Sequence, residues 1–319
     1  MSIPETIAHR LSIPVIGSPL FIISNPDLVI AQCRAGVIGS FPSLNARPLT
    51  QLDEWLHRLS TELTEADAPF AVNLIVHKTT ARLDDDLAMC VKYKVPVVIT
   101  SLGARADIND AIHSYGGIVL HDVINDRFAH KAIEKGADGL IAVAAGAGGH
   151  AGTTSPFALI QEIRQWFDGP LALSGSIANG AAVLAALAMG ADFAYIGSAF
   201  IATTEARADE RYKAMIVNSA ASDIVYSNLF TGVHGNYLRP SIVAAGMDPD
   251  NLATSDASAM NFGSGGTSDA KAWKDIWGCG QGIGSITEVQ GAGAFIAKLR
   301  REYDAARARL GLERQAVAA

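Results

Sequence analysis

The sequence is poor in cysteine and carries no excess of positive charge. Its three cysteines, Cys33, Cys90 and Cys279, lie far apart among 319 residues, and no CxxC pair occurs. This spacing argues against a disulfide framework and against a zinc site, and it fits a reducing cytoplasm. The formal net charge is −7, which argues against a protein that binds nucleic acid or an anionic membrane.

Several sequence signatures are also missing. There is neither a GxxxxGK[ST] phosphate loop nor a GxGxxG dinucleotide fingerprint, and no basic N-terminal segment leads into a long apolar run. The most apolar stretch, residues 181–202, is interrupted by Gly190 and Asp192. It predicts a helix followed by a buried strand instead of a membrane span. We therefore expect a cytoplasmic protein with no membrane or nucleic-acid partner.

Apolar residues and glycine are abundant, at 49% of the chain and 30 residues respectively. Short apolar runs recur, and amphipathic helical patterns separate them. Because the runs are continuous and not alternating, they indicate strands that are buried on both faces. Eight such units predict a (β/α)8 TIM barrel, with a doubly wound open sheet as the alternative. The strands are expected at Ile13–Gly17, Val37–Phe41, Phe70–Val76, Val97–Ser101, Gly117–His121, Gly139–Ala144, Leu171–Ser174 and Phe193–Gly197.

The alternation of strands and helices stops after the eighth strand. Residues 203–218 have a helical pattern, whereas residues 222–270 are rich in Gly, Ser, Asn and Asp. Long irregular insertions of this kind often form lids over active sites. We expect residues 1–221 and 283–319 to form the barrel, and residues 222–282 to form an irregular or helical lid on the substrate side.

Two glycine-serine segments follow the last two predicted strands. Ser174-Gly175-Ser176 comes after the seventh strand and Gly197-Ser198 after the eighth. The loops at these two places commonly form a phosphate site in barrels of this kind. Glycine lets the backbone approach an anion, and amide N–H groups at a helix N-terminus favour negative charge. The pair predicts a phosphate site, and ordinary glycine turns are the alternative.

A histidine follows the sixth predicted strand, in Gly148-Gly149-His150. Small residues before it leave room for a flat ring, and an imidazole can take a carbon-bound proton or donate to a developing oxyanion. A loop histidine that caps a backbone carbonyl is the alternative. His121, at the end of the fifth strand, and His234, in the insertion, are further candidates for cofactor and substrate contacts. No spacing among these residues predicts a metal site.

Motifs along nearly the whole chain resemble the nitronate monooxygenase family, formerly called 2-nitropropane dioxygenases. This family is part of a larger set of FMN-dependent barrels that includes NAD(P)H:quinone reductases and an FMN-type enoyl-acyl-carrier-protein reductase. The motifs that carry the resemblance are Pro14–Leu20, Phe70–Leu74, Gly148–Gly152, Ser174–Gly180, Ala191–Ser198 and Trp277–Gly282.

The resemblance implies FMN as the cofactor and a role for each matching position. It implies that His150 is catalytic, and we expect His150 and His234 to meet the substrate. The residues expected to bind FMN are Gly17, Ser18, Pro19, Asn73, His121, Gly149, Ser174, Gly175, Ser176, Gly197, Ser198 and Gln281. Within this set Gly175, Ser176, Gly197 and Ser198 hold the phosphate, and Asn73 and Gln281 lie near the flavin ring.

This sequence departs from the family pattern at four places. Val143 and Gly146 stand where many members have Gln and Glu, Ser176 stands where Gly is usual, and the first strand lacks the frequent Met. The resemblance implies oxidation of alkyl nitronates by molecular oxygen. The alternative keeps FMN but takes electrons from NAD(P)H for quinones, nitro compounds or enoyl thioesters. Two further hypotheses stay open: a barrel enzyme without redox chemistry, and a flavin-binding protein without catalytic activity. The sequence does not determine the oligomeric state, and a homodimer is compatible with it.

Overall fold

Eight parallel strands form a closed barrel in the computed structural model, which describes residues 4–77, 79–255 and 275–312. The strand order is β1-β9-β8-β6-β5-β4-β3-β2, and a parallel bridge between Ile16 and Ile38 joins the two ends. This closure confirms the TIM barrel and excludes the open sheet. The strands are β1 (Val15–Gly17), β2 (Gly39–Pro42), β3 (Phe70–Ile75), β4 (Val97–Ser101), β5 (Ile118–Val123), β6 (Gly139–Val143), β8 (Leu171–Ser174) and β9 (Phe193–Ile196).

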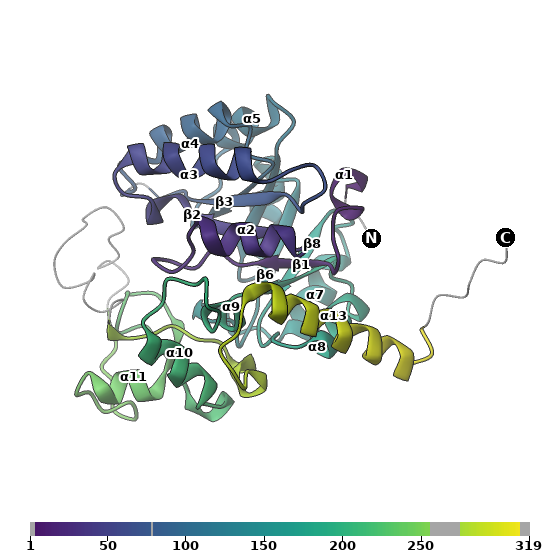
Figure 1. Ribbon diagram of the computed structural model, residues 1–319. Coiled ribbons are helices and arrows are strands. Elements are labelled where there is room, and N and C mark those ends of the chain that lie inside the picture. The colour runs from purple at the N-terminus through teal and green to yellow at the C-terminus, as the bar shows by residue number, and fades with distance from the viewer. Residues whose placement is uncertain (1–3, 78, 256–274, 313–319) are drawn as a thin grey trace.

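Helices surround the barrel, and Figure 1 shows α2, α3 and α13 on its outside. Asparagine caps fix several of them at their N-termini. The Asn25 side chain accepts from the Asp27 amide at 2.8 Å, and the Asn179 side chain accepts from the Ala182 amide at 2.9 Å. The helices are α1 (Glu5–Ala8), α2 (Pro26–Arg34), α3 (Leu49–Glu62), α4 (Leu83–Lys92), α5 (Ala106–His113), α6 (Asp126–Glu134), α7 (Pro156–Arg164), α8 (Gly180–Ala188) and α13 (Ala292–Arg309).

The barrel interior is filled by apolar side chains from most of its strands. Ile16, Ile99 and Ile141 are fully buried members of this cluster, and Ile7 of α1 joins it. Because the interior is a packed core and not a pore, the open space of this fold lies at one end of the strands. The functional site is therefore expected where the strands end.

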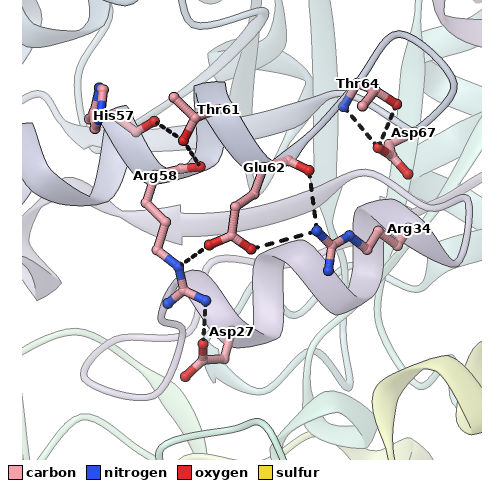
Figure 2. Close-up of polar contacts among 8 residues, drawn as sticks. All are labelled: Asp27, Arg34, His57, Arg58, Thr61, Glu62, Thr64 and Asp67. Carbon is pink, nitrogen blue, oxygen red and sulfur yellow. Dashed lines mark hydrogen bonds and ion pairs between the residues drawn. The ribbon is translucent and has the colours of Figure 1, made fainter.

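An ionic network on the outer surface links α2 to α3 (Figure 2). Arg58 lies 2.8 Å from Asp27 and 2.6 Å from Glu62, and Arg34 lies 3.6 Å from Glu62. Arg34 also donates to the Glu62 carbonyl at 3.2 Å. These side chains are 37–62% exposed, so the network orients two barrel helices with little burial of charge.

A small antiparallel sheet, which the sequence did not predict, joins two strands of the region after the barrel to one strand in the loop after β6. Its strands are β10 (Ile224–Ser227), β11 (Gly235–Leu238) and β7 (Gly149–His150), in the order β10-β11-β7. The described part of the expected lid is thus regular, with α11 (Arg239–Ala244) after the hairpin. Residues 256–274 of that lid lie outside the described residues, and the division into barrel and lid stays a prediction.

Two boundaries differ from those expected from the sequence. Of the helix expected over residues 203–218, only Glu210–Val217 is helical (α10), and a separate short helix, α9 (Ser198–Ile201), directly follows the eighth barrel strand. The fifth strand continues to Val123, which places Asp122 inside it. A search of the described residues finds no helix that is both long and apolar enough to cross a bilayer.

Candidate active site

A large cavity, about 1110 Å³, lies where the barrel strands end. Its walls come from segments that follow most of the strands and from the insertion. Eleven of the residues expected to form the site line this cavity: Ser18, Pro19, Asn73, His121, Gly149, His150, Ser174, Gly175, Ser176, Gly197 and Ser198.

Three loops and the late Gly-Gln segment meet on one side of the cavity. The Gly146 carbonyl accepts from the amide of Ser176 at 3.3 Å and from the amide of Gln281 at 2.9 Å. The Ser198 hydroxyl accepts from the Gly280 amide at 2.9 Å. The loops after β6, β8 and β9 are therefore joined around a group of amides and hydroxyls. We call this group, formed by Gly146, Ser176, Ser198 and Gly280, the amide cradle.

Glycine is needed in the cradle because the backbones approach closely. A Cβ at Gly146 would lie 2.1 Å from the Ser176 hydroxyl, and a Cβ at Gly175 would lie 2.8 Å from the Ala145 carbonyl. Gly175 also has φ +138, which side chains rarely adopt. Glycine thus lets the loops pack together at the cavity wall, where the hydroxyls of Ser176 and Ser198 can donate to an anionic group such as a phosphate. The residues present fit the phosphate end of a flavin nucleotide.

A polar chain crosses the ends of β3, β4 and β5. The Asn73 amide nitrogen donates to the Ser101 hydroxyl at 2.7 Å, and that hydroxyl donates to Asp122 Oδ2 at 2.6 Å. Asp122 Oδ1 is buried and has no partner among the described residues. Burial raises the pKa of Asp122 to about 6, against which the Ser101 hydrogen bond acts. An unpartnered buried oxygen beside a cavity points to a ligand group that would bond to it.

Two histidines face the cavity as neutral rings. The Thr100 hydroxyl lies 2.6 Å from His121 Nδ1, and the Thr231 hydroxyl lies 3.0 Å from His150 Nε2. Burial lowers the pKa of each imidazole to about 4. The Thr231 hydroxyl also lies 3.0 Å from the Val233 carbonyl, so either Nε2 or the hydroxyl can be the donor in the pair with His150, according to the tautomer of the ring. Both rings are uncharged at neutral pH.

The insertion holds His150 in place. β7 pairs with β11, in the register Gly235 to His150 and Asn236 to Gly149. The Asn236 side chain donates to the Ala147 carbonyl at 2.7 Å, and the Tyr226 hydroxyl donates to the Ala151 carbonyl at 3.0 Å. The segment on both sides of His150 is thereby fixed to the hairpin.

Three expected site residues do not line the cavity. Gly17 is buried in β1, where a Cβ would meet Gln32, and Gln281 contributes its backbone to the cradle. His234 is exposed and stacks on Tyr226 at 5.1 Å between ring centroids, beside a separate small hollow. Asp122 and Thr231 line the cavity, although sequence reasoning gave them no role in the site. The sequence feature that could have identified Asp122 as a site residue is a carboxylate directly after a predicted apolar strand.

A scan against protein-family models finds one match, the nitronate monooxygenase model, over residues 78–300. The chain belongs to the nitronate monooxygenase family. It is accordingly an enzyme of a flavin-dependent oxidoreductase family. The match begins shortly before α4 and ends within α13, and it therefore includes His150 and the whole cradle.

Individual members differ in the activities after which they are named. A nitronate monooxygenase of Paraburkholderia phytofirmans is 26% identical, covering 74% of this chain and 76% of that protein. A (3aS,4S,5R,7aS)-5-hydroxy-7a-methyl-1-oxo-octahydro-1H-indene-4-carboxyl-CoA dehydrogenase of Rhodococcus jostii is 25% identical, covering 78% of this chain and 69% of that one. Membership in the family therefore leaves the substrate undetermined.

Solved structures share the fold. Nitroalkane oxidase from Streptomyces ansochromogenes superposes with a TM-score of 0.80 at 22% identity, covering 96% of this chain and all of that one. FabK from Thermotoga maritima superposes with a TM-score of 0.77 at 24% identity, covering 95% and 96%. At these identities the likeness shows the barrel and its insertion, not the reaction.

Proposed function

We propose that the protein binds FMN and oxidises alkyl nitronates with molecular oxygen. The observation that carries the proposal is the joining of the amide cradle and His150 in one cavity. Ser176, Ser198 and the surrounding amides would hold the phosphate, while Ser18, Pro19 and Asn73 would lie along the ring system. When bound, FMN supplies the electron-accepting ring, and the protein contributes binding, orientation and exclusion of side reactions.

The uncharged state of His150 suits a nitronate better than a neutral nitroalkane. A base whose pKa is about 4 removes a carbon-bound proton poorly at neutral pH. A nitronate has already lost that proton. The ring can instead form a hydrogen bond with the substrate, and Thr231 fixes its orientation. The role of His150 is thus to position the anion.

Sequence relatives support the proposal. The Paraburkholderia phytofirmans relative and a Neurospora crassa relative, 25% identical over 90% of this chain, both carry the name nitronate monooxygenase. The Rhodococcus jostii relative, a CoA-ester dehydrogenase by name, supports the alternative in which NAD(P)H donates electrons to FMN and a quinone, nitro compound or enoyl thioester accepts them.

Anaerobic mixing of the FMN-loaded protein with the nitronate of 2-nitropropane tests the proposal. We expect loss of the visible flavin absorbance with the nitronate and much slower loss with neutral 2-nitropropane. Bleaching by NADH or NADPH but not by nitronate would select the alternative, and no bleaching by either would reject both.

Replacement of His150 tests the positioning role. We expect His150→Asn to lower kcat/KM for the nitronate by about a hundredfold or more. The matched control is His57→Asn, since His57 is exposed on α3. An activity of His150→Asn within a few-fold of the wild type would contradict the role of His150.

A further inference from the structure

Two aliphatic residues at the cavity have an unusual backbone. Apart from glycines, the described residues with positive φ are Ile22 (58°), Lys94 (48°), Leu102 (69°) and Ser176 (57°). Lys94 follows the end of α4, where left-handed residues are common, and Ser176 belongs to the cradle. For Ile22, which is β-branched, and for Leu102 the conformation is strained. Strain of this kind gathers at ligand-binding sites.

Specific contacts hold these two strained residues. The Ile22 amide donates to Asn45 Oδ1 at 2.7 Å, and Asn45 Nδ2 donates to the carbonyls of Leu20 and Ser24, each at 2.9 Å. Leu102 follows β4 directly and precedes Gly103, whose missing Cβ would lie 2.2 Å from the Val76 carbonyl. The fold therefore maintains both strained positions, although neither buries its own side chain.

Ile22 and Leu102 are part of a larger apolar surface at the cavity. Ile22 is 48% exposed and Leu102 is 41% exposed, while Ile124 and Phe128 are 42% and 39% exposed. All four line the cavity, from segments that follow β1, β4 and β5. We call these four residues the apolar rim. One exposed aliphatic side chain is ordinary, but a group around one opening indicates a binding surface.

Positive charge flanks the Ile22 turn. Arg47 and Arg207 line the same cavity, and neither forms an ion pair within the part of the chain that the structure describes. Arg47 lies 5.8 Å from the centre of the Phe21 ring, and the Arg207 amide donates to the Ile23 carbonyl at 3.1 Å. In a chain of net charge −7, two unpaired guanidinium groups at an opening favour an anionic ligand.

We propose that the substrate has an extended apolar body that ends in an anionic group. The body lies against the apolar rim, and the anion meets Arg47 and Arg207. This inference rests on the proposed function for the reacting end of the molecule and adds the class of substrate: a long or broad amphipathic anion, not a short nitroalkane. The strained Ile22 and Leu102 determine that specificity.

Binding of unreactive probes tests the inference apart from turnover. The FMN-loaded protein is titrated with octanoate, butyrate and octanol, and binding is followed by the shift of the flavin spectrum and by calorimetry. We expect octanoate to bind at least tenfold more tightly than either other probe. Equal affinity for butyrate and octanoate would overturn the inference. Octanoate binding without nitronate oxidation would overturn the proposed function alone.

Variants test the contributions of the apolar rim and of the two arginines to binding separately. We expect Leu102→Gly and Ile22→Gly to weaken octanoate binding three- to tenfold, with a melting temperature that is no lower, because glycine adopts positive φ without strain. We expect the double variant Arg47→Gln/Arg207→Gln to weaken the binding of octanoate but not the binding of octanol. Arg301→Gln/Arg309→Gln, which removes the same number of charges from exposed positions on α13, is the control. If the glycine variants lose affinity for FMN but keep their affinity for octanoate, the apolar rim binds the flavin and the inference is overturned.

Discussion

Gly146 and Ser176 show that two departures from the family pattern explain each other. The sequence resemblance implies Glu at position 146 in many family members and Gly at position 176. A Cβ at position 146 would lie 2.1 Å from the Ser176 hydroxyl, so the serine occupies the space that a side chain at 146 would need. The φ of 57° at Ser176 also explains why glycine is usual there.

Gly175 and Ser176 form a matched pair for mutation. We expect Gly175→Ala to destabilise the protein by about 2 kcal/mol, because φ +138 is strained for alanine. We also expect FMN affinity to fall at least tenfold. Ser176→Gly accepts its φ freely, so its stability should stay close to the wild type, although its FMN affinity should fall with the loss of the phosphate-binding hydroxyl. Urea unfolding and quenching of flavin fluorescence measure both quantities, and an equal loss of stability in the two variants would contradict this account.

The sequence predicted most of the site residues because each lies in the second half of a barrel strand or in the loop after one, and the ends of parallel barrel strands share one face. Ser18, Asn73, His121, His150 and Ser198 all line the cavity for this reason. His234 does not, since it precedes a strand of the insertion, whose placement the sequence did not reveal. Asp122 was missed because the fifth strand continues two residues further than its apolar run suggests.

At the scale of elements, the barrel strands were predictable and the insertion strands were not. Continuous apolar runs mark strands that are buried on both faces, so all eight barrel strands were found within a few residues. β10 and β11 have four residues each, too few to establish a period, and β7 has two. β7 exists only because β11 supplies its hydrogen bonds.

The surface network between α2 and α3 is expected to stabilise the protein only slightly. We predict that Glu62→Gln lowers the free energy of unfolding by less than about 1 kcal/mol, because the paired side chains are substantially exposed. The loss should shrink in concentrated salt. Glu65→Gln is the control, since no ion pair of Glu65 is found among the described residues. Urea unfolding at low and high salt measures the difference, and a loss above about 2 kcal/mol would be incompatible with solvent screening.

The stability of the whole molecule should respond to two buried groups with opposite signs. Burial lowers the pKa of His121 to about 4 from its usual 6.5, so the stability associated with the neutral ring is lost as the pH falls through that window. Burial raises the pKa of Asp122 to about 6 from its usual 3.8, so stability associated with the neutral carboxyl is lost as the pH rises through that window.

Replacement of Asp122 should therefore change the pH profile of unfolding. We expect Asp122→Asn to be more stable than the wild type at pH ~7.5, by at most about 3 kcal/mol at ~1.4 kcal/mol per pKa unit. The difference should vanish near pH ~4, where the wild-type carboxyl is protonated. Urea unfolding at both pH values measures it. His121→Gln should instead reduce the loss of unfolding free energy that the wild type shows as the pH falls below about 6.5. A constant effect of Asp122→Asn across the range would contradict the buried-carboxyl account.

The pairing of β7 with β11 has a consequence for how such an enzyme can diversify. The imidazole of His150 belongs to a different sheet from the strands that support the cofactor cradle. Sequence changes in the hairpin would therefore reposition the imidazole, and they would reach the amide cradle only through the contacts of Asn236, whose carbonyl accepts from the Cys279 amide beside Gly280. A chimera that exchanges the hairpin between relatives would also transfer the orientation of the His150 side chain, provided that the contact of Asn236 with the Ala147 carbonyl is exchanged too.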